Sequence, residues 1–294
     1  MKCPDDFCAF ILTHGRPDKV YTIKSLKDSG YTGKVFLVVD DKDKTLPEYK
    51  KLYGDNVLVF SKDEIVKTFD EGDNFNDRRA IIYARNACFE LAKKVGCKYF
   101  IQLDDDYTKW NYKYGLNGNY GEWQIKNLDS IMLSMLNFYK KTPALSVAFA
   151  QNGDFIGGAE GSNAQSIALK RKCMNTFICS TDRPFNFFGR INEDVNTYTN
   201  LAHRGGLFLT VLNVAIIQKQ TQSNKGGMTD LYLDSGTYVK SFYTVMYSPS
   251  MAKIGEIGTT QRRLHHRIKW SNAVPVILNE SYKKKSNNNL QVIE

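Results

Sequence analysis

The sequence predicts an α/β protein with a mostly parallel, Rossmann-like sheet flanked by helices. Two features of the first hundred residues lead to this prediction. Apolar runs alternate there with helical patterns, and strands that are separated by helices pair in parallel through right-handed crossovers. The unusual polar residues fall at the ends of the apolar runs, where such sheets bind ligands. We therefore expect a functional site at the carboxyl ends of the strands.

Strands and helices alternate before Tyr107. Phe7–Thr13 is a continuous apolar run, which is typical of a strand buried on both faces. Pro17 favours the start of a helix over Asp18–Ser29, which Gly30 ends. The other expected elements are strands at Val35–Val39, Val57–Phe60 and Tyr99–Leu103, a short helix at Leu46–Tyr53 and a long amphipathic helix at Asp77–Val95.

The pattern becomes less regular after Tyr107. A stretch rich in Tyr, Gly and Asn, up to Trp123, is expected to form a loop. No repeat or long linker divides the chain, so we expect one domain over residues 1–282 and a flexible polar tail at 283–294. The later elements are a helix around Gln124–Lys140, a strand at Leu145–Phe149, one or two strands within Ser166–Cys179, a long strand at Gly206–Ile217, a helix at Asp230–Met246 and a last strand at His265–Trp270.

Two features favour a cytoplasmic protein. No run approaches the roughly 18–20 apolar residues of a membrane span, and two aspartates stand ahead of the short apolar segment at the N-terminus. The six cysteines show no CxxC spacing and the chain has only four histidines, so a zinc site is not indicated. Free buried thiols are expected instead.

The chain carries a net charge of +9, with 40 basic residues against 31 acidic ones. The excess is concentrated near the C-terminus, where eight Lys and Arg residues stand between Lys253 and Lys285 against Glu256 and Glu280. Such a segment is a candidate contact for a phosphate backbone. The alternative is a solvated basic surface.

Three consecutive carboxylates, Asp104, Asp105 and Asp106, follow the apolar run that ends at Leu103. Carboxylates at the end of a buried strand are costly unless a positive group lies among them. In an extended chain Asp104 and Asp106 project to one side and can share a divalent ion, and oxygen ligands favour Mg²⁺ or Mn²⁺. Such an ion neutralises a departing diphosphate. A solvated acidic turn is the alternative.

A second acidic pair, Glu193 and Asp194, is expected on the first turn of a helix, after the aromatic segment that contains Phe185 and Phe188. Carboxylates at this place often only complement the helix dipole and cap the helix. As a functional pair, one of them would face an acceptor hydroxyl as general base or positioning group. The sequence does not distinguish the two residues.

Two adjacent histidines lie in the basic stretch Arg263–Trp270. A neutral imidazole can complete the shell of a metal, and neighbouring cations can pair with a diphosphate. Side chains alternate along a strand, so only one of His265 and His266 would be the ligand. The apolar neighbours Leu264 and Ile268 favour His266 as the inward one. A basic edge strand is the alternative.

Weaker signals for a nucleotide lie at the ends of the first two strands and on the long helix. Residues 13–16 would lie over a nucleotide, and Asp40 or Asp41 could accept hydrogen bonds from a uracil or a ribose. Arg78 and Arg85 are seven positions apart and therefore share a helix face, so one of them could reach a phosphate.

A resemblance to GT-A glycosyltransferases is carried by the segments FILTHGRP, VFLVVDD, AIIYARNACFELAKKVGCKYFIQLDDDY and NEDVN. The chain looks most like the TET/JBP-associated group, which is found largely in bacteriophages. The resemblance implies a GT-A-like fold with a donor half at about residues 1–110 and an acceptor half at about 111–282. It also implies transfer of a hexose or pentose from a nucleotide sugar, expected to be UDP-linked, to a hydroxylated pyrimidine in DNA such as 5-hydroxymethylcytosine.

Carried over by position, the resemblance implies that Asp104 and Asp106 hold the metal and the donor, with His266 or His265 approaching the ion. Asp194 or Glu193 would face the acceptor. Aromatic residues at Trp110–Trp123 and Phe185–Phe188 could stack on a base extruded from the helix. The expected contacts of the nucleotide sugar are Thr13, Arg16, Asp40, Asp41, Arg85, Asp104 and Asp105.

Two alternatives stay open. The same chemistry could act on a glycan, a lipid head group or a protein. The chain could instead be a nucleic-acid-binding protein, or a metal-dependent nuclease that uses the acidic triplet. A phage-encoded enzyme would work in the cytoplasm of its host cell.

Overall fold

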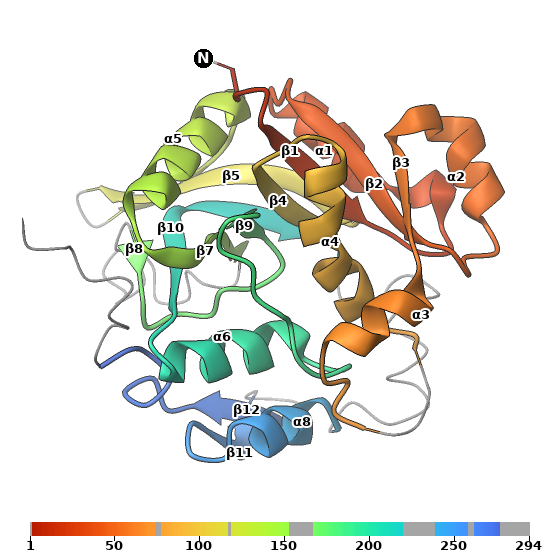
Figure 1. The fold of residues 1–294 in the computed structure, drawn as a ribbon. Helices are drawn as coiled ribbons and strands as arrows, with labels where there is room; N and C mark the ends of the chain where they lie inside the picture. Colours follow the sequence, from red (N-terminus) through yellow and green to blue (C-terminus); the bar gives the residue numbers. More distant parts are fainter. Residues whose placement is uncertain are drawn as a thin grey trace, which may run out of the picture.

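The computed structural model describes residues 2–73, 78–116, 119–152, 167–219, 239–257 and 262–276. A ten-stranded mixed sheet runs through this part of the chain (Figure 1). Its strands are β1 (Phe7–Leu12), β2 (Lys34–Asp40), β3 (Val57–Phe60), β4 (Tyr99–Asp104), β5 (Tyr107–Leu116), β6 (Asn119–Gln124), β7 (Ala144–Gln151), β8 (Ile167–Ala168), β9 (Phe177–Ser180) and β10 (Leu207–Gln218). They lie in the order β3-β2-β1-β4-β9-β7-β10-β5-β6, with β8 paired to β10.

The first four strands are parallel to one another. β1 pairs in parallel with β2 and β4, and β2 pairs in parallel with β3. The other half is mixed, because β9 is antiparallel to β4 and β7 while β10 is parallel to β7. The β5–β6 hairpin continues the sheet beyond β10 in antiparallel pairing. The α/β, GT-A-like class predicted from the sequence is confirmed. Every described antiparallel pair of the main sheet involves at least one strand from β5 to β10.

Helices cover both faces of this sheet (Figure 1). One face carries α1 (Tyr21–Asp28), α2 (Leu46–Tyr53) and α5 (Leu128–Lys141), and the other carries α4 (Ile82–Lys94) and α6 (Glu193–His203). Alternate residues of β1 divide between two apolar clusters. Ala9 and Ile11 pack on the first face, and Cys8 and Phe10 pack on the second. Because both faces are covered, β1 is apolar at every position.

Smaller elements complete the described fold. Single 3-10 turns occupy Pro17–Lys19, Gly54–Asn56 and Val66–Thr68, and α3 (Lys62–Ile65) follows β3. Outside the main sheet, α8 (Val239–Tyr247) packs against a two-stranded antiparallel ribbon made of β11 (Ala252–Ile257) and β12 (Arg263–Ile268). Figure 1 shows this group on the side of α6 that faces away from the sheet.

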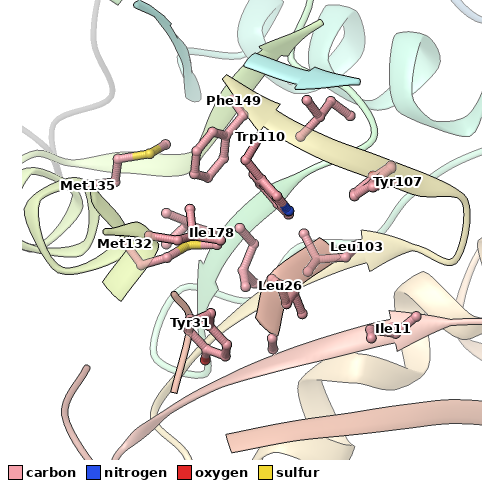
Figure 2. Close-up of a cluster of buried hydrophobic side chains, with 14 of the residues drawn as sticks. Ile11, Leu26, Tyr31, Leu103, Tyr107, Trp110, Met132, Met135, Phe149 and Ile178 are labelled. Atoms are coloured by element: carbon pink, nitrogen blue, oxygen red, sulfur yellow. The ribbon is translucent and has the colours of Figure 1, made fainter. Parts of the chain in front are cut away.

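The stretch that was expected to be a loop after Tyr107 forms a hairpin instead. β5 and β6 pair from Asn111 opposite Gln124 to Leu116 opposite Asn119. Trp110 is fully buried in the apolar cluster beneath α1 and α5, beside Phe149 (Figure 2). It also lies opposite Ile216 of β10. The prediction failed because the other partner of β5, β10, is distant in sequence.

Other predictions from the sequence can be compared with the structure. The long helix begins at Ile82 rather than Asp77, after a segment in which Arg78 pairs with Asp63 at 2.6 Å. The glycine-rich residues 153–161, residues 230–238 of an expected helix and the tail 283–294 lie outside the described residues. All six cysteines are free thiols and five are buried, as predicted. Within the ranges given above, no helix combines the length and apolar character that a membrane span requires.

Candidate active site

The carboxyl ends of β1, β2 and β4 meet at one edge of the sheet. The register pairs Leu12 of β1 with Val38 of β2 and with Asp104 of β4. The polar residues that follow these strands, at 13–16, 40–43 and 104–106, therefore lie together. This is the edge at which the sequence predicted a site.

Asp105 is used inside the protein to fix the loop after β1. Its Oδ2 accepts hydrogen bonds from Thr13 Oγ1 at 2.7 Å and from Arg16 Nε at 2.8 Å. The Tyr49 hydroxyl lies 2.7 Å from Thr13 Oγ1 and accepts a bond from the Arg16 backbone NH. Burial raises the pKa of Asp105, and Arg16 and Thr13 offset part of that rise. The side chain is 2% exposed, and the bonds that the structure shows for it are to Thr13 and Arg16.

Asp104 faces the opposite way, toward α4 and α6. Arg85 Nη2 donates to Asp104 Oδ1 at 3.0 Å, and Arg85 Nε donates to Glu193 Oε1 at 2.8 Å. The guanidinium is buried over the ring of Phe177 at 5.1 Å. Burial raises the pKa of Asp104 to about 7, Arg85 opposes the rise, and neighbouring carboxylates, chiefly Asp106, add to it. One arginine thus joins the acidic triplet to the second acidic pair.

Asp106 is the least satisfied of the three aspartates. Its Oδ1 is buried, and among the described residues it has no hydrogen-bond partner. Burial raises the pKa of Asp106 to about 6, and the charge of Asp105 adds to the rise. A buried carboxylate without a partner is costly, and a divalent cation would remove that cost. Mg²⁺ is commonly held by one or two carboxylates together with substrate phosphates, so the donor set of Asp104 and Asp106 fits such an ion.

The backbone of the triplet is held by Thr22 of α1. Thr22 Oγ1 donates to the carbonyl of Asp104 at 2.6 Å and accepts from the Tyr107 NH at 3.0 Å. The Thr22 NH donates to the carbonyl of Asp105 at 3.2 Å. These bonds fix the conformation of the turn that contains Asp106. Sequence reasoning missed Thr22, because a threonine on a helix gives no local signal for such a contact.

His14, Asp40 and Asp43 form a second polar cluster beside the first. His14 Nδ1 lies 2.7 Å from Asp40 Oδ2 and 3.3 Å from Asp43 Oδ2. The hydrogen bond to Asp40 raises the pKa of His14. Lys62 Nζ lies 3.2 Å from Asp40, and the Gly15 NH donates to Asp43 at 2.7 Å. The carboxylates are therefore already engaged in holding the loop after β1.

Asp40 and Asp41, both predicted donor contacts, differ in their surroundings. Asp40 is buried, and although burial raises its pKa, the bond from His14 and the charge of Lys62 bring the net pKa below the usual value. Asp41 is exposed and accepts a bond from the Lys62 NH at 3.1 Å. Asp43 and Lys62 were not among the residues predicted from the sequence.

The two carboxylates at the start of α6 have different partners. Glu193 is paired with Arg85, as described above. Asp194 is 6% exposed, its Oδ1 accepts the Val195 NH at 2.7 Å, and no cation of the described residues lies within ion-pair distance of it. Burial raises the pKa of Asp194 to about 6, and the charge of Glu193 adds to the rise. The structure therefore distinguishes two residues that the sequence left equivalent.

His266 contacts the residue that precedes the acidic pair of α6. Its Nδ1 lies 3.2 Å from Nδ2 of Asn192, which precedes Glu193 and has a left-handed backbone with φ of 57°. Burial lowers the pKa of His266 to about 3, and His265 and nearby lysines add to this effect, so the ring is neutral. Its ring centroid lies 4.2 Å from that of His265.

The predicted metal ligands do not come together as one set. Within the described ranges, the only group of three or more His, Cys, Asp or Glu residues with ligand atoms within 4.8 Å of one another is His14, Asp40 and Asp43. Asp104 and Asp106 are therefore not joined by a histidine in such a group.

The aromatic segments expected to stack on a base are largely core. Trp110 and Phe187 are fully buried and Phe185 is 9% exposed. That expectation is wrong for these three residues, because they pack between the sheet and its covering helices. Trp123 is 63% exposed. Leu264, expected to face inward beside His266, is 44% exposed, which corrects that part of the alternation.

The chain has matches among solved structures and to a family model. Among solved structures, TarS 1–349 of S. aureus in complex with UDP matches with a TM-score of 0.44 and 14% identity, over 74% of this chain and 59% of that chain. The chain thus spans less than two thirds of that relative's length. Glucosyl-3-phosphoglycerate synthase of Mycobacterium tuberculosis, in complex with Mn²⁺, UDP and phosphoglyceric acid, matches with a TM-score of 0.46 and 9% identity, over 89% of this chain and 86% of that chain.

A search of curated protein sequences gives no match. A family model does match, and it covers three quarters of the chain. The model is that of the TET-associated glycosyltransferases, and it matches residues 7–227. The matched region contains both acidic clusters and every strand of the main sheet. The chain belongs to the TET-associated glycosyltransferase family.

Proposed function

We propose that the protein transfers a sugar from a UDP-sugar to the hydroxyl of a modified pyrimidine in DNA, such as 5-hydroxymethylcytosine. Asp104 and Asp106 would hold Mn²⁺ or Mg²⁺. The observation that carries the proposal is the state of these two half-buried carboxylates. Their pKa values are raised to about 7 and about 6, and one oxygen of Asp106 has no partner among the described residues. Such a pair at the end of β4 is suited to bind a cation.

On the donor side, an ion held by Asp104 and Asp106 would supply Lewis-acid neutralisation of a diphosphate leaving group. The protein supplies a fixed rim for the nucleotide. Asp105 holds Thr13 and Arg16 in place, and the Arg16 side chain remains 23% exposed. Asp40 and Asp41 follow β2 at the same edge and offer carboxylate oxygens as acceptors for a uracil or a ribose. Because the acceptors are fixed before binding, little ordering is needed when the donor arrives.

On the acceptor side, we assign Asp194 as the general base. The proton of the acceptor hydroxyl would move to the Asp194 carboxylate as the oxygen attacks the sugar. Asp194 suits this role because it has no ion-pair partner among the described residues and a pKa of about 6, which lies near the pH of cytoplasm. Glu193 is instead engaged in an ion pair with Arg85. Its role is to hold Arg85 between the two acidic clusters.

A DNA acceptor is supported by the family to which the chain belongs and by the net charge of +9. A glycan, lipid or protein acceptor is the competing assignment for the same chemistry. The two can be separated by incubating the protein and Mn²⁺ with radiolabelled UDP-sugars and with duplexes that carry 5-hydroxymethylcytosine or plain cytosine. We expect label on the hydroxymethylated duplex only.

The Asp194→Asn variant is the matched control in this experiment, because it should bind the donor and leave the DNA unlabelled. Label on a glycan, lipid or protein while both duplexes stay unlabelled would remove the DNA acceptor and keep the transferase. Cleavage of DNA by the protein and metal, without any nucleotide sugar, would replace the proposal with a nuclease.

A further inference from the structure

The residues 239–257 and 262–276, which we call the C-terminal unit, comprise α8, β11 and β12. They lie outside the matched residues 7–227 and pack on α6 (Figure 1). Trp270 stacks on Tyr198 of α6 with ring centroids 5.8 Å apart. Ser248 Oγ lies 3.0 Å from Oγ1 of Thr199 on α6. The C-terminal unit is thus attached to the helix that begins with the acceptor carboxylates.

The β11–β12 ribbon has one inward and one outward face. Its register places Ala252 opposite Ile268 and Ile254 opposite His266. Ala252 and Ile268 pack into the protein, and His266 contacts Asn192 at 3.2 Å. Side chains alternate along a strand, so the pair between these two, Lys253 and Arg267, points outward.

The outward face carries cations directly opposite each other. Lys253 and Arg267 are register partners and both are exposed. Lys269 is also exposed, and its NH donates to the carbonyl of Met251 at 2.7 Å, which continues the same ladder. Like charges directly opposite on a two-stranded ribbon are destabilising. In the part of the chain that the structure describes, no carboxylate lies within ion-pair distance of these three residues to relieve the repulsion.

Arg267 is also held in a fixed position. Its side chain lies flat across Gly255, where an added Cβ would come within 2.5 Å of Arg267 Nε. Arg267 Nη2 donates to the carbonyl of Glu256 at 2.6 Å. A guanidinium that is ordered before binding loses less side-chain entropy when it meets an oxyanion. The one acidic residue of the described C-terminal unit, Glu256, lies at a register position of the inward face and pairs with Arg262 at 3.4 Å.

We propose that Lys253, Arg267 and Lys269 bind the phosphate backbone of DNA that flanks the modified base. The inference rests on the proposed DNA acceptor and names the surface that holds it. The unit's inward face contacts Asn192, which precedes Glu193 and Asp194, so the ribbon connects the cationic outward face to the helix that begins with these carboxylates. Fixed cations that repel each other in the free protein are stabilised by a polyanion.

The direct test removes the three charges together. The variant Lys253→Gln/Arg267→Gln/Lys269→Gln and the control Lys27→Gln/Lys50→Gln/Lys51→Gln, which removes three exposed lysines of α1 and α2, lose the same net charge. Binding of a fluorescent hydroxymethylated duplex is measured by anisotropy from 50 to 300 mM salt. Each phosphate contact contributes about 0.9 to the slope of log K against log salt. We expect the first variant to lose about three units of slope and at least about tenfold in affinity at 150 mM salt, and the control to match the wild type.

A second variant reverses one charge and predicts two effects of opposite sign. Lys253→Glu places a carboxylate opposite Arg267, so the melting temperature should stay equal or rise while DNA binding weakens at least about tenfold. Transfer to free 5-hydroxymethyl-deoxycytidine should be unchanged in both variants. Wild-type affinity and slope in either variant would overturn the inference. A third outcome separates the two proposals. If the wild type binds DNA through these three residues but transfers no sugar to it, the DNA-binding surface is supported and the proposed DNA acceptor is wrong.

Discussion

Two groups of carboxylates, one around the loop after β1 (Asp40, Asp43 and Asp105) and one made of Asp106 and Asp194, differ in their partners. Asp40, Asp43 and Asp105 are bonded to His14, Lys62, Arg16 or backbone NH groups. Asp106 has an oxygen with no partner, and Asp194 has no ion-pair partner, among the described residues. The first group builds a rigid rim. The second group retains free binding capacity, which is the property that the proposed contacts with metal and substrate require.

The largest effect expected from this comparison comes from exchanging Asp106 and Asp105 for alanine. Asp106→Ala should reduce sugar transfer by at least about 10³-fold, because the divalent ion loses a ligand. Its free energy of unfolding should stay equal or rise, because a carboxylate with a buried oxygen that lacks a partner among the described residues has been removed. Asp105→Ala should instead destabilise the fold by about 3–5 kcal/mol, because Arg16 loses its partner. Transfer assays and urea unfolding of the two variants measure both effects, and normal turnover by Asp106→Ala would remove the metal assignment.

Arg85 joins the two acidic clusters, and its removal should damage both. Arg85→Met keeps much of the side-chain volume but leaves Asp104 and Glu193 buried without their cation. We expect a loss of about 3–5 kcal/mol in the free energy of unfolding. Adding Glu193→Gln to this variant should restore part of the loss, because one uncompensated charge is neutralised. Equal stability of the single and double variants would show that Arg85 and Glu193 are not coupled.

The general base can be separated from its neighbour by two isosteric changes. Asp194→Asn should lower kcat by about 10²–10⁴-fold while the affinity for UDP stays normal, because only proton removal is lost. Glu193→Gln should retain more activity than Asp194→Asn, because it weakens the contact with Arg85 and leaves the base in place. Steady-state kinetics on hydroxymethylated DNA give both values. The reverse ranking would assign the base to Glu193.

The smallest effect is a shift of the pH profile. Asp194 must be ionised to accept a proton, and its pKa is raised to about 6, so kcat/KM should fall about tenfold per pH unit below pH 6 and level off above it. Glu193 adds to the rise in this pKa, so Glu193→Gln should move the acidic limb to lower pH. An unchanged limb in that variant would mean that another group is being titrated.

The sequence predictions were accurate where the structure depends on local patterns and failed where it depends on contacts between distant segments. β3 and α2 begin and end as predicted, since their periodicity is local. β5 was missed because its aromatic residues became core only through contact with α1 and β10. The sequence located both acidic clusters. It did not show that Asp105 is an internal partner or that Thr22 supports the turn, because these contacts join elements far apart in the chain.

The histidines show a further limit of sequence reasoning. His266 was expected near the metal because imidazole is a common ligand, yet in the structure its described partner is Asn192. Nothing in the local pattern indicated that the C-terminal unit would pack on α6. The like-charged pair Lys253 and Arg267 was likewise invisible until the register of β11 and β12 was known.

The most direct test of the central claim is donor binding without any acceptor. Melting temperatures of the wild type and of Asp104→Asn/Asp106→Asn are measured with UDP, Mn²⁺, both together, and UDP with EDTA. If the end of β4 binds a cation that carries the diphosphate, UDP and Mn²⁺ together should stabilise the wild type by about 2.7 kcal/mol at a ligand concentration 100 times Kd. Neither should do so alone, and the double variant should not respond. Equal stabilisation by UDP in EDTA, or in the double variant, would contradict the account.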